Sequence, residues 1–273
     1  MKTFVARRWT LLTVALLAAA LLLTAFVAYH LRLHQTAFAS GWILLAMMLF
    51  LAGYNLRKKL RLFPLLPTSY WLQAHIYVGL LAVVVFAWHM GLRLPRGPLE
   101  ASLAAAYLLT TATGIFGLWL SRAVPPRLTT RGQEVIYERI PAMRRTLRER
   151  AERLAVEAVE ESRSTVLADF YEQELAGFFA GGRDRLAHLL QSARPLRKRL
   201  NRLDALRRYV NREEAVYLDD LSEMVRAKDA LDYHQVMQGL LKGWLFVHVP
   251  ITWALLLLIA VHMVAVHAFS GAL

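Results

Sequence analysis

The chain has 273 residues, of which 57% are hydrophobic, and its 33 Lys and Arg against 20 Asp and Glu give a formal net charge of +13 at pH 7. One soluble domain rarely combines so apolar a composition with so large a basic excess, so the composition indicates a membrane protein with polar segments outside the bilayer. The chain has no cysteine, which excludes disulfides, thiolate metal sites, iron–sulfur ligation and the covalent attachment of c-type haem.

Five apolar stretches are long enough to cross a bilayer core, which takes about 20 residues in a helix: 9–29, 37–56, 70–92, 99–121 and 244–269. The sequence therefore predicts an all-α, polytopic membrane protein with five transmembrane helices. The first stretch follows a basic lead-in at residues 1–8 and contains a small-residue pattern at 25–28, so cleavage as a signal peptide is the alternative for it. His30 and His34 follow in a loop, where a solvated surface role is expected.

The third stretch carries two histidines 14 positions apart, His75 and His89. Since a helix advances about 1.5 Å and about 100° per residue, 14 steps carry a side chain about 21 Å along the axis and to within about 40° of its starting face. Gly79 lies one turn after His75 on the same face. Three aromatic residues of this stretch are expected to be either interfacial anchors or quinone contacts: Tyr70, Trp71 and Trp88.

The fourth stretch follows a loop with Arg93 and Arg96 and contains two glycines, Gly114 and Gly117. Together with Gly79, these glycines would let a flat cofactor approach a helix backbone closely. Tight packing of one helix on another, for which small residues are common in membranes, is the alternative.

Residues 125–242 are polar and hold 19 of the 20 acidic residues. They are predicted to form a helical cytoplasmic insertion between transmembrane regions at 1–124 and 243–273. Pro141 suits the first turn of a helix that runs through 161, Ser164 or Thr165 can cap a second helix that ends at 181–182, and a third is expected near 195–210. His188 and His234 are expected to be structural.

Asn211 and Glu214 resemble a capping box, and the helix that it opens is expected to continue from Arg212 through Lys242 into the last span. No glycine-rich turn of the nucleotide-binding kind occurs in the polar segment. A flavin or nicotinamide dehydrogenase is therefore expected on another molecule.

The last stretch repeats the spacing of the third, with His248 and His262 again 14 positions apart. Pro250 removes a helical hydrogen bond and is expected to kink the helix beside His248. His267 is expected to point away from the face of His262 and to be interfacial, with a quinone contact as the alternative.

The distribution of basic residues predicts the orientation of the chain in the membrane. Thirty of the 33 lie at 2–8, 57–61 and 122–242, on one side of five crossings, and Arg32, Arg93 and Arg96 lie on the other. By the positive-inside rule the amino terminus is cytoplasmic and the carboxyl terminus exterior, in the cytoplasmic (inner) membrane of the cell. The basic face is expected to attract anionic lipid, or alternatively to dock a partner protein.

With this orientation the third and fifth spans run in the same direction, so His75 is level with His248 near the cytoplasm and His89 is level with His262 near the exterior. Ionisable residues inside a membrane are costly and usually functional. Paired imidazoles at two depths predict two haem b groups, held non-covalently, with His75 and His248 on one iron and His89 and His262 on the other. Cations that could pair with haem propionates are Arg93 and Arg96 outside, and Arg122 and Lys242 inside.

These residues resemble those of di-haem b-type cytochromes, in particular the cytochrome b subunit of quinol:cytochrome c oxidoreductases. Their place on the third and fifth spans is similar to that in the membrane domain of ferric reductases and NADPH oxidases. The resemblance covers 70–122 and 244–269 and implies a haem-binding four-helix bundle. The chain lacks the Pro-Glu-Trp-Tyr sequence of the first family, and its long polar segment is unlike either pattern.

The resulting hypothesis is a di-haem cytochrome b subunit that relays electrons across the membrane between a quinone pool and a partner redox protein. The partner would be an iron–sulfur protein, a dehydrogenase or a multihaem cytochrome c, and no nucleic-acid partner is expected. One alternative is a transmembrane reductase that passes cytoplasmic electrons to an exterior metal or multihaem cytochrome. Another is a haem-free membrane anchor or signalling scaffold.

Overall fold

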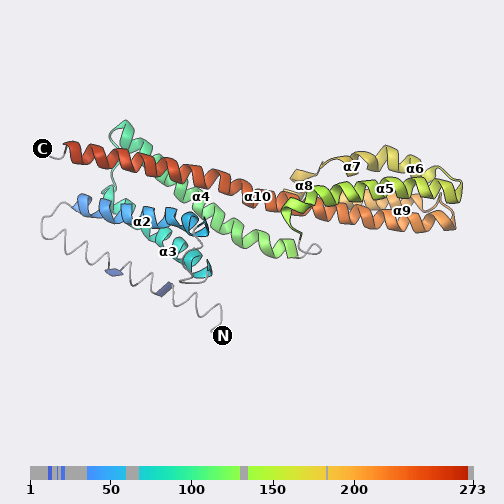
Figure 1. Cartoon of the computed structure of the whole chain (residues 1–273), viewed down its shortest axis with the longest axis horizontal. Coiled ribbons are helices and arrows are strands. Elements are labelled where there is room, and N and C mark those ends of the chain that lie inside the picture. The colour runs from blue at the N-terminus through green and yellow to red at the C-terminus, as the bar shows by residue number, and fades with distance from the viewer. Residues whose placement is uncertain are drawn as a thin grey trace. The chain divides into compact units, whose positions relative to one another are not determined.

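A computed structural model describes residues 12, 13, 17, 20, 21, 36–59, 68–129, 135–182 and 184–269, and these residues form helices and turns but no strand. The first predicted span lies almost entirely outside the described residues, as do His30 and His34. The helices in chain order are α2 (Thr36–Lys59), α3 (Thr68–His89), α4 (Pro98–Thr129), the 3₁₀ helix η1 (Tyr137–Arg139), α5 (Ile140–Ser162), α6 (Val166–Phe170), the π-helix η2 (Tyr171–Leu175), α7 (Ala176–Ala180), α8 (Arg185–Leu189), α9 (Arg194–Leu206) and α10 (Arg212–Phe269) (Figure 1).

Four of the described helices, α2, α3, α4 and α10, are long and apolar enough to cross a membrane. Large apolar side chains on them are exposed, including Phe246 (81%) and Leu257 (68%). Exposed apolar surface on this scale suits contact with lipid and not with water. These helices are consistent with a multi-pass membrane protein.

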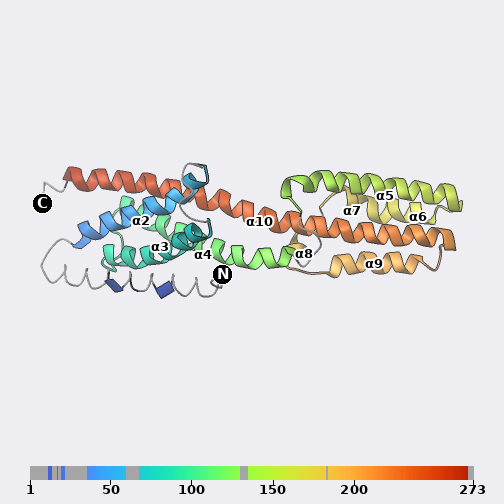
Figure 2. The same ribbon diagram turned by 60° about the horizontal axis from the view of Figure 1, so that its bottom comes forward.

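The chain divides into two compact units, one formed by residues 1–118 and 245–273 and the other by residues 119–244. In the first unit α2 and α3 lie side by side (Figures 1 and 2). Met48, Ala82, Tyr107 and Leu255 form the buried core of this unit. Ala82 lies seven residues from both His75 and His89, and Leu255 lies seven residues from both His248 and His262. The packed core is therefore midway between the two histidine levels, about 10 Å along the helix from each.

Two helix boundaries differ from the sequence prediction. α3 ends at His89, because Gly91 and Leu92 adopt positive φ angles of 59° and 56° and their N–H groups donate to Trp88 O (2.9 Å) and Ala87 O (3.2 Å). α4 extends beyond residue 121, where the predicted fourth span ends, and continues through two prolines to Thr129. Leu120 and Val124 on this extension are buried in a cluster with Tyr233 and Met237 of α10, and this tertiary packing outweighs the low helix propensity of proline.

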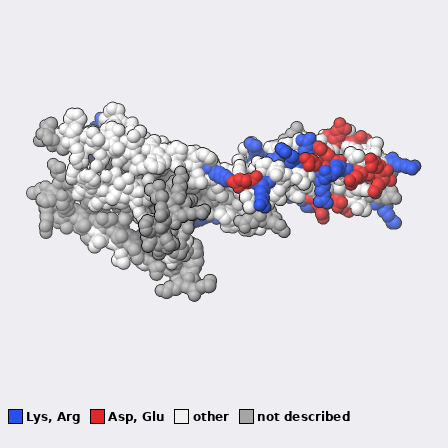
Figure 3. Space-filling view, in the orientation of Figure 1, with Lys and Arg blue, Asp and Glu red and all other residues white. Residues whose placement is uncertain are grey.

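The second unit packs α5, α6, α7 and α9 against the amino-terminal part of α10 around a core that includes Leu167, Leu175, Phe178, Leu203 and Leu221. Charged side chains of both signs gather over this unit on the face in Figure 3, while the described surface of the first unit is largely uncharged there. The predicted helix after Ser164 is interrupted by the π-helix η2, and α8 is not foreseen by the sequence.

Two predicted helix starts in this unit are confirmed. Pro141 lies in the first turn of α5. At the start of α10, Glu214 N donates to Asn211 Oδ1 (2.8 Å) and Asn211 N donates to the Glu214 carboxylate (3.2 Å), which is a capping box.

A buried polar network ties α10 to α5 and to the end of α7. Lys228 has no exposed surface, and its Nζ donates to Gly181 O (2.7 Å) and to the Asp232 carboxylate. Arg144 Nε lies 3.2 Å from Asp232 Oδ1. The network leaves the buried ammonium and carboxylate paired, as burial requires.

Candidate functional site

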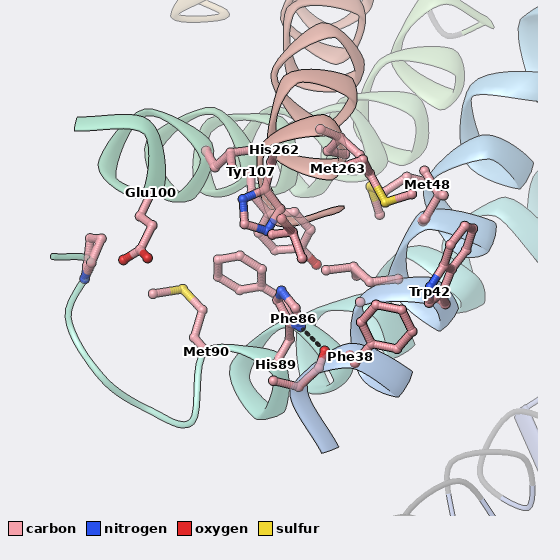
Figure 4. A pocket seen from close by; sticks show the side chains of 18 of the residues that line it. Phe38, Trp42, Met48, Phe86, His89, Met90, Glu100, Tyr107, His262 and Met263 are labelled. Atoms are coloured by element: carbon pink, nitrogen blue, oxygen red, sulfur yellow. Dashed lines mark hydrogen bonds between the residues drawn. The ribbon is translucent and has the colours of Figure 1, made fainter. Parts of the chain in front are cut away.

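The ends of α3 and α10 bring His89 and His262 together. Their ring centres are 6.4 Å apart and their planes are perpendicular, at 90° (Figure 4). A histidine nitrogen binds a metal at about 2.0 Å and a ring centre lies about 1.1 Å from each nitrogen, so two imidazoles on opposite sides of one metal have centres about 6.2 Å apart. The separation of His89 and His262 therefore fits axial ligation of a single iron.

Hydrogen bonds fix the orientation of His89. Its Nδ1 lies 3.0 Å from Ala37 O and 3.1 Å from Ser40 Oγ, and Ser40 Oγ donates to Ala37 O (3.0 Å). Because a carbonyl oxygen only accepts, Nδ1 carries the hydrogen of the neutral ring. The lone pair is then on Nε2, the nitrogen that a metal would take.

The second pair is His75 of α3 and His248 of α10, which are close enough for an electrostatic interaction. His248 Nδ1 lies 2.9 Å from Thr113 Oγ1, whose own hydrogen is donated to Leu109 O (2.8 Å). His75 Nδ1 is buried without a hydrogen-bond partner among the described residues, and the ring lies 5.2 Å from that of Tyr54. The four histidines thus lie as two pairs, one at each level.

A cavity of about 820 Å³ surrounds the pair His89 and His262. Cofactor and ligand pockets commonly enclose about 300 to 1,000 Å³. α2, α3, α4, α10 and the turn at 90–96 line it, and Phe86 and Tyr107, stacked with ring centres 3.9 Å apart, project into it beside the two histidines (Figure 4). Its size and largely apolar lining fit a flat macrocycle held between helices.

The sequence left two roles open for the glycines, close approach of a flat cofactor or packing of one helix on another, and Gly114 and Gly79 differ in which role their contacts fit. A Cβ on Gly114 would lie 3.5 Å from His248 Cε1, so this glycine borders the second histidine pair. A Cβ on Gly79 would meet only Leu51 of α2, at 4.0 Å, so the alternative of helix packing applies to Gly79. Gly117 is buried one turn beyond Gly114.

The candidate propionate partners fall in different units. Arg93 and Arg96 line the cavity, where Arg96 N donates to Glu100 Oε2 (2.9 Å). Arg122 and Lys242 belong to the second unit. Arg122 is exposed there, and Lys242 pairs with Glu138 and lies 4.1 Å from the Tyr137 ring centre.

His267 lies on a different face of α10 from His262, five residues further on, but both line the same cavity. The His267 ring centre lies 5.8 Å from that of Phe38 and 6.0 Å from that of Trp42, and its Nδ1 donates to Met263 O (2.8 Å). The cavity extends around α10 toward α2, which brings this second face of the helix into it. His188 and His234 are buried in the second unit.

Sequence reasoning missed the residues that hold the histidines. Ala37, Ser40 and Gly41 lie in the first turns of α2, where a Cβ on Gly41 would be only 3.1 Å from His89 Cε1. Thr113 directly precedes Gly114 and lies close to two further threonines, Thr110 and Thr111. A small or hydroxyl side chain on a transmembrane helix is too common a feature to identify such contacts.

Among the described residues no group of three or more His, Asp or Glu side chains could hold a metal ion. Each histidine pair therefore offers two imidazole side chains. No protein-family model, curated protein or solved structure matches the chain.

Proposed function

We propose that the chain is a di-haem b-type cytochrome that relays electrons across the cytoplasmic membrane between a quinone pool and a partner redox protein. His89 and His262 would hold the exterior haem, and His75 and His248 the cytoplasmic one. The amino terminus would lie in the cytoplasm and the carboxyl terminus outside, as the basic residues indicate.

The observation that carries the proposal is the geometry of His89 and His262. Ring centres 6.4 Å apart match ligation of one iron from both sides, and the hydrogen bond from His89 Nδ1 to Ala37 O directs the lone pair to Nε2. Edge-to-face packing of two rings also gives centres about 4.5 to 7 Å apart, so the separation supports the proposal only together with the direction of the His89 lone pair and the adjoining cavity of about 820 Å³.

A bound haem would supply a reversible one-electron couple. The chain's own contribution would be two imidazole nitrogens for each haem iron, and an iron held in this way would favour relay over catalysis at the metal. The two levels are 14 residues apart on both helices, about 21 Å. An electron that crosses the bilayer works with or against the membrane potential, about 2.3 kcal/mol per 100 mV.

The relay is tested with full-length protein in liposomes that contain trapped ferricyanide, with a membrane-impermeant reductant added outside. The intact protein should reduce the trapped ferricyanide, whereas His262→Leu and His75→Leu, each of which removes one ligand from a different pair, should both stop the reduction. Replacement of the external reductant by a quinol analogue tests the quinone end. Reduction that either variant leaves unchanged would contradict a relay through two haems.

A further inference from the structure

The second unit contains a cavity of about 320 Å³, and all of the residues that line it belong to that unit. α10 lines one wall at every third or fourth residue from Asp232 to Leu240, which is one face of the helix, and α8 lines another. Over these eight residues, about 12 Å of helix, the lining on α10 changes from polar, at Asp232 and Gln235, to apolar, at Val236 and Leu240. The cavity therefore has a polar end and an apolar end, and its volume lies near the lower end of the range for ligand pockets.

His188 lines this cavity from α8 and is only 3% exposed. Both of its ring nitrogens are buried without a hydrogen-bond partner among the described residues. The nearer oxygen of Asp229 lies 3.8 Å from His188 Nε2, which is beyond hydrogen-bond distance. A buried polar group without a hydrogen bond is costly, and a neutral imidazole has one N–H to donate. The ring can therefore donate to an oxygen atom that enters the cavity.

Two arginines meet at the polar end, beside Gly182. A Cβ on Gly182 would lie 3.7 Å from Arg144 Nη2 and 3.8 Å from Arg185 Nε, so both guanidinium groups border the space next to this glycine. Hydrogen bonds from arginine to a carboxylate or a phosphate are about 2.7 to 2.9 Å long. One oxyanion beside Gly182 is therefore within reach of both arginines.

The charges at the polar end favour an anion. The two carboxylates that line the cavity already have cationic partners, because Asp184 pairs with Arg199 (2.7 Å) and Asp232 belongs to the buried network with Lys228. Arg185 is exposed and makes no ion pair within the described part of the chain. An anion in the cavity would thus meet one guanidinium whose charge no described carboxylate balances.

We propose that this cavity binds a small organic anion. The carboxylate or phosphate head group of this anion accepts hydrogen bonds from Arg144, Arg185 and His188, and its apolar part lies against Val236 and Leu240. A volume of about 320 Å³ suits a small molecule and not a lipid with two acyl chains. The site goes beyond electron relay, since it shares no residue with the two histidine pairs.

Isothermal titration calorimetry of the full-length protein in detergent tests the site with benzoate and phenyl phosphate, which carry the two head groups on the same apolar ring. We expect both to bind, one molecule per chain, with dissociation constants of about 1 mM or lower. Benzamide, which keeps the shape of benzoate without its charge, should not bind. Acetate, which lacks the ring, should bind at least about tenfold more weakly than benzoate.

Three variants connect binding to the proposed contacts. Arg185→Gln removes the guanidinium of an exposed side chain and should weaken benzoate binding about threefold to tenfold, with thermal unfolding of the ligand-free protein unchanged. His188→Phe keeps a buried ring without its nitrogens and should weaken binding about tenfold or more. The matched control is Arg145→Gln, which removes the same charge from an exposed position of α5 outside the cavity and should leave the affinity unchanged.

Three results would overturn the proposal: no binding of either anion, equal affinity for benzoate and benzamide, or equal effects of Arg185→Gln and Arg145→Gln. Dihexanoyl phosphatidylglycerol, a soluble anionic lipid, separates a lipid head group from a free small molecule. It should not displace benzoate, and displacement would overturn the assignment of the cavity to a small anion.

Discussion

Gly41 and Gly114 each border a different histidine, and the space beside them differs by a few tenths of an ångström. A Cβ on Gly41 would lie 3.1 Å from His89 Cε1 and 3.6 Å from His89 Nδ1. A Cβ on Gly114 would lie 3.5 Å from His248 Cε1, an ordinary van der Waals contact. Gly53, on the same helix as Gly41, has nothing within 4 Å and serves as the matched control.

Replacement of each glycine by alanine adds the same helix-propensity gain of about 0.5 to 1 kcal/mol. Only Gly41→Ala also overpacks its site, which costs about 1 to 3 kcal/mol. Since the displaced atoms belong to His89, most of this cost should appear as weaker binding of the exterior haem, a factor of about 5 to 150. Gly114→Ala should behave like Gly53→Ala.

Haem affinity is measured as the rate of transfer from the purified protein to apomyoglobin, followed at wavelengths that separate the two haems. Gly41→Ala should lose one haem faster than Gly53→Ala and keep the other. Equal retention of both haems in the Gly41 and Gly53 variants would refute the assignment of His89 as a ligand in the orientation described. Faster loss in Gly114→Ala than in Gly41→Ala would do the same.

Two predictions concern the second unit. Removal of one partner from a buried ion pair costs about 3 to 5 kcal/mol of stability. Lys228→Met should cost an amount near the lower end of this range, because Asp232 keeps Arg144 as a partner at 3.2 Å. Thermal unfolding of the full-length protein in detergent measures the loss of stability, and an unchanged unfolding midpoint would contradict the network. Asn211→Ala removes the cap that accepts from Glu214 N (2.8 Å) and should cost about 0.5 to 2 kcal/mol, whereas Asn211→Asp, which keeps an acceptor, should restore stability in the same assay.

The pairing of the histidines could be predicted because two regularities act together. Helical periodicity relates positions 14 apart, and the distribution of basic residues predicts that the two helices run in the same direction. The capping box at Asn211 is equally local, since both of its partners lie within one turn. Features that depend on three or four neighbouring residues, or on one helical period, can be predicted from the sequence.

The rotation of a helix about its own axis, which decides which side chains face a neighbouring helix, cannot be predicted in this way. Gly79 and Gly41 are both glycines in apolar helices, yet side-chain packing turns Gly79 toward Leu51 and Gly41 toward His89. The same rotation brings His267 into the cavity and places Thr113, among several threonines, beside His248. The extension of α4 through two prolines likewise depends on contacts with α10, more than 100 residues later in the chain.

The amount of haem per chain tests the central claim most directly. Haem is extracted from the purified full-length protein and quantified as its pyridine complex, and the protein is quantified by amino-acid analysis. The proposal predicts two non-covalent b-type haems per chain in the unsubstituted protein and one in His262→Leu. A ratio of zero or one in the unsubstituted protein would contradict it.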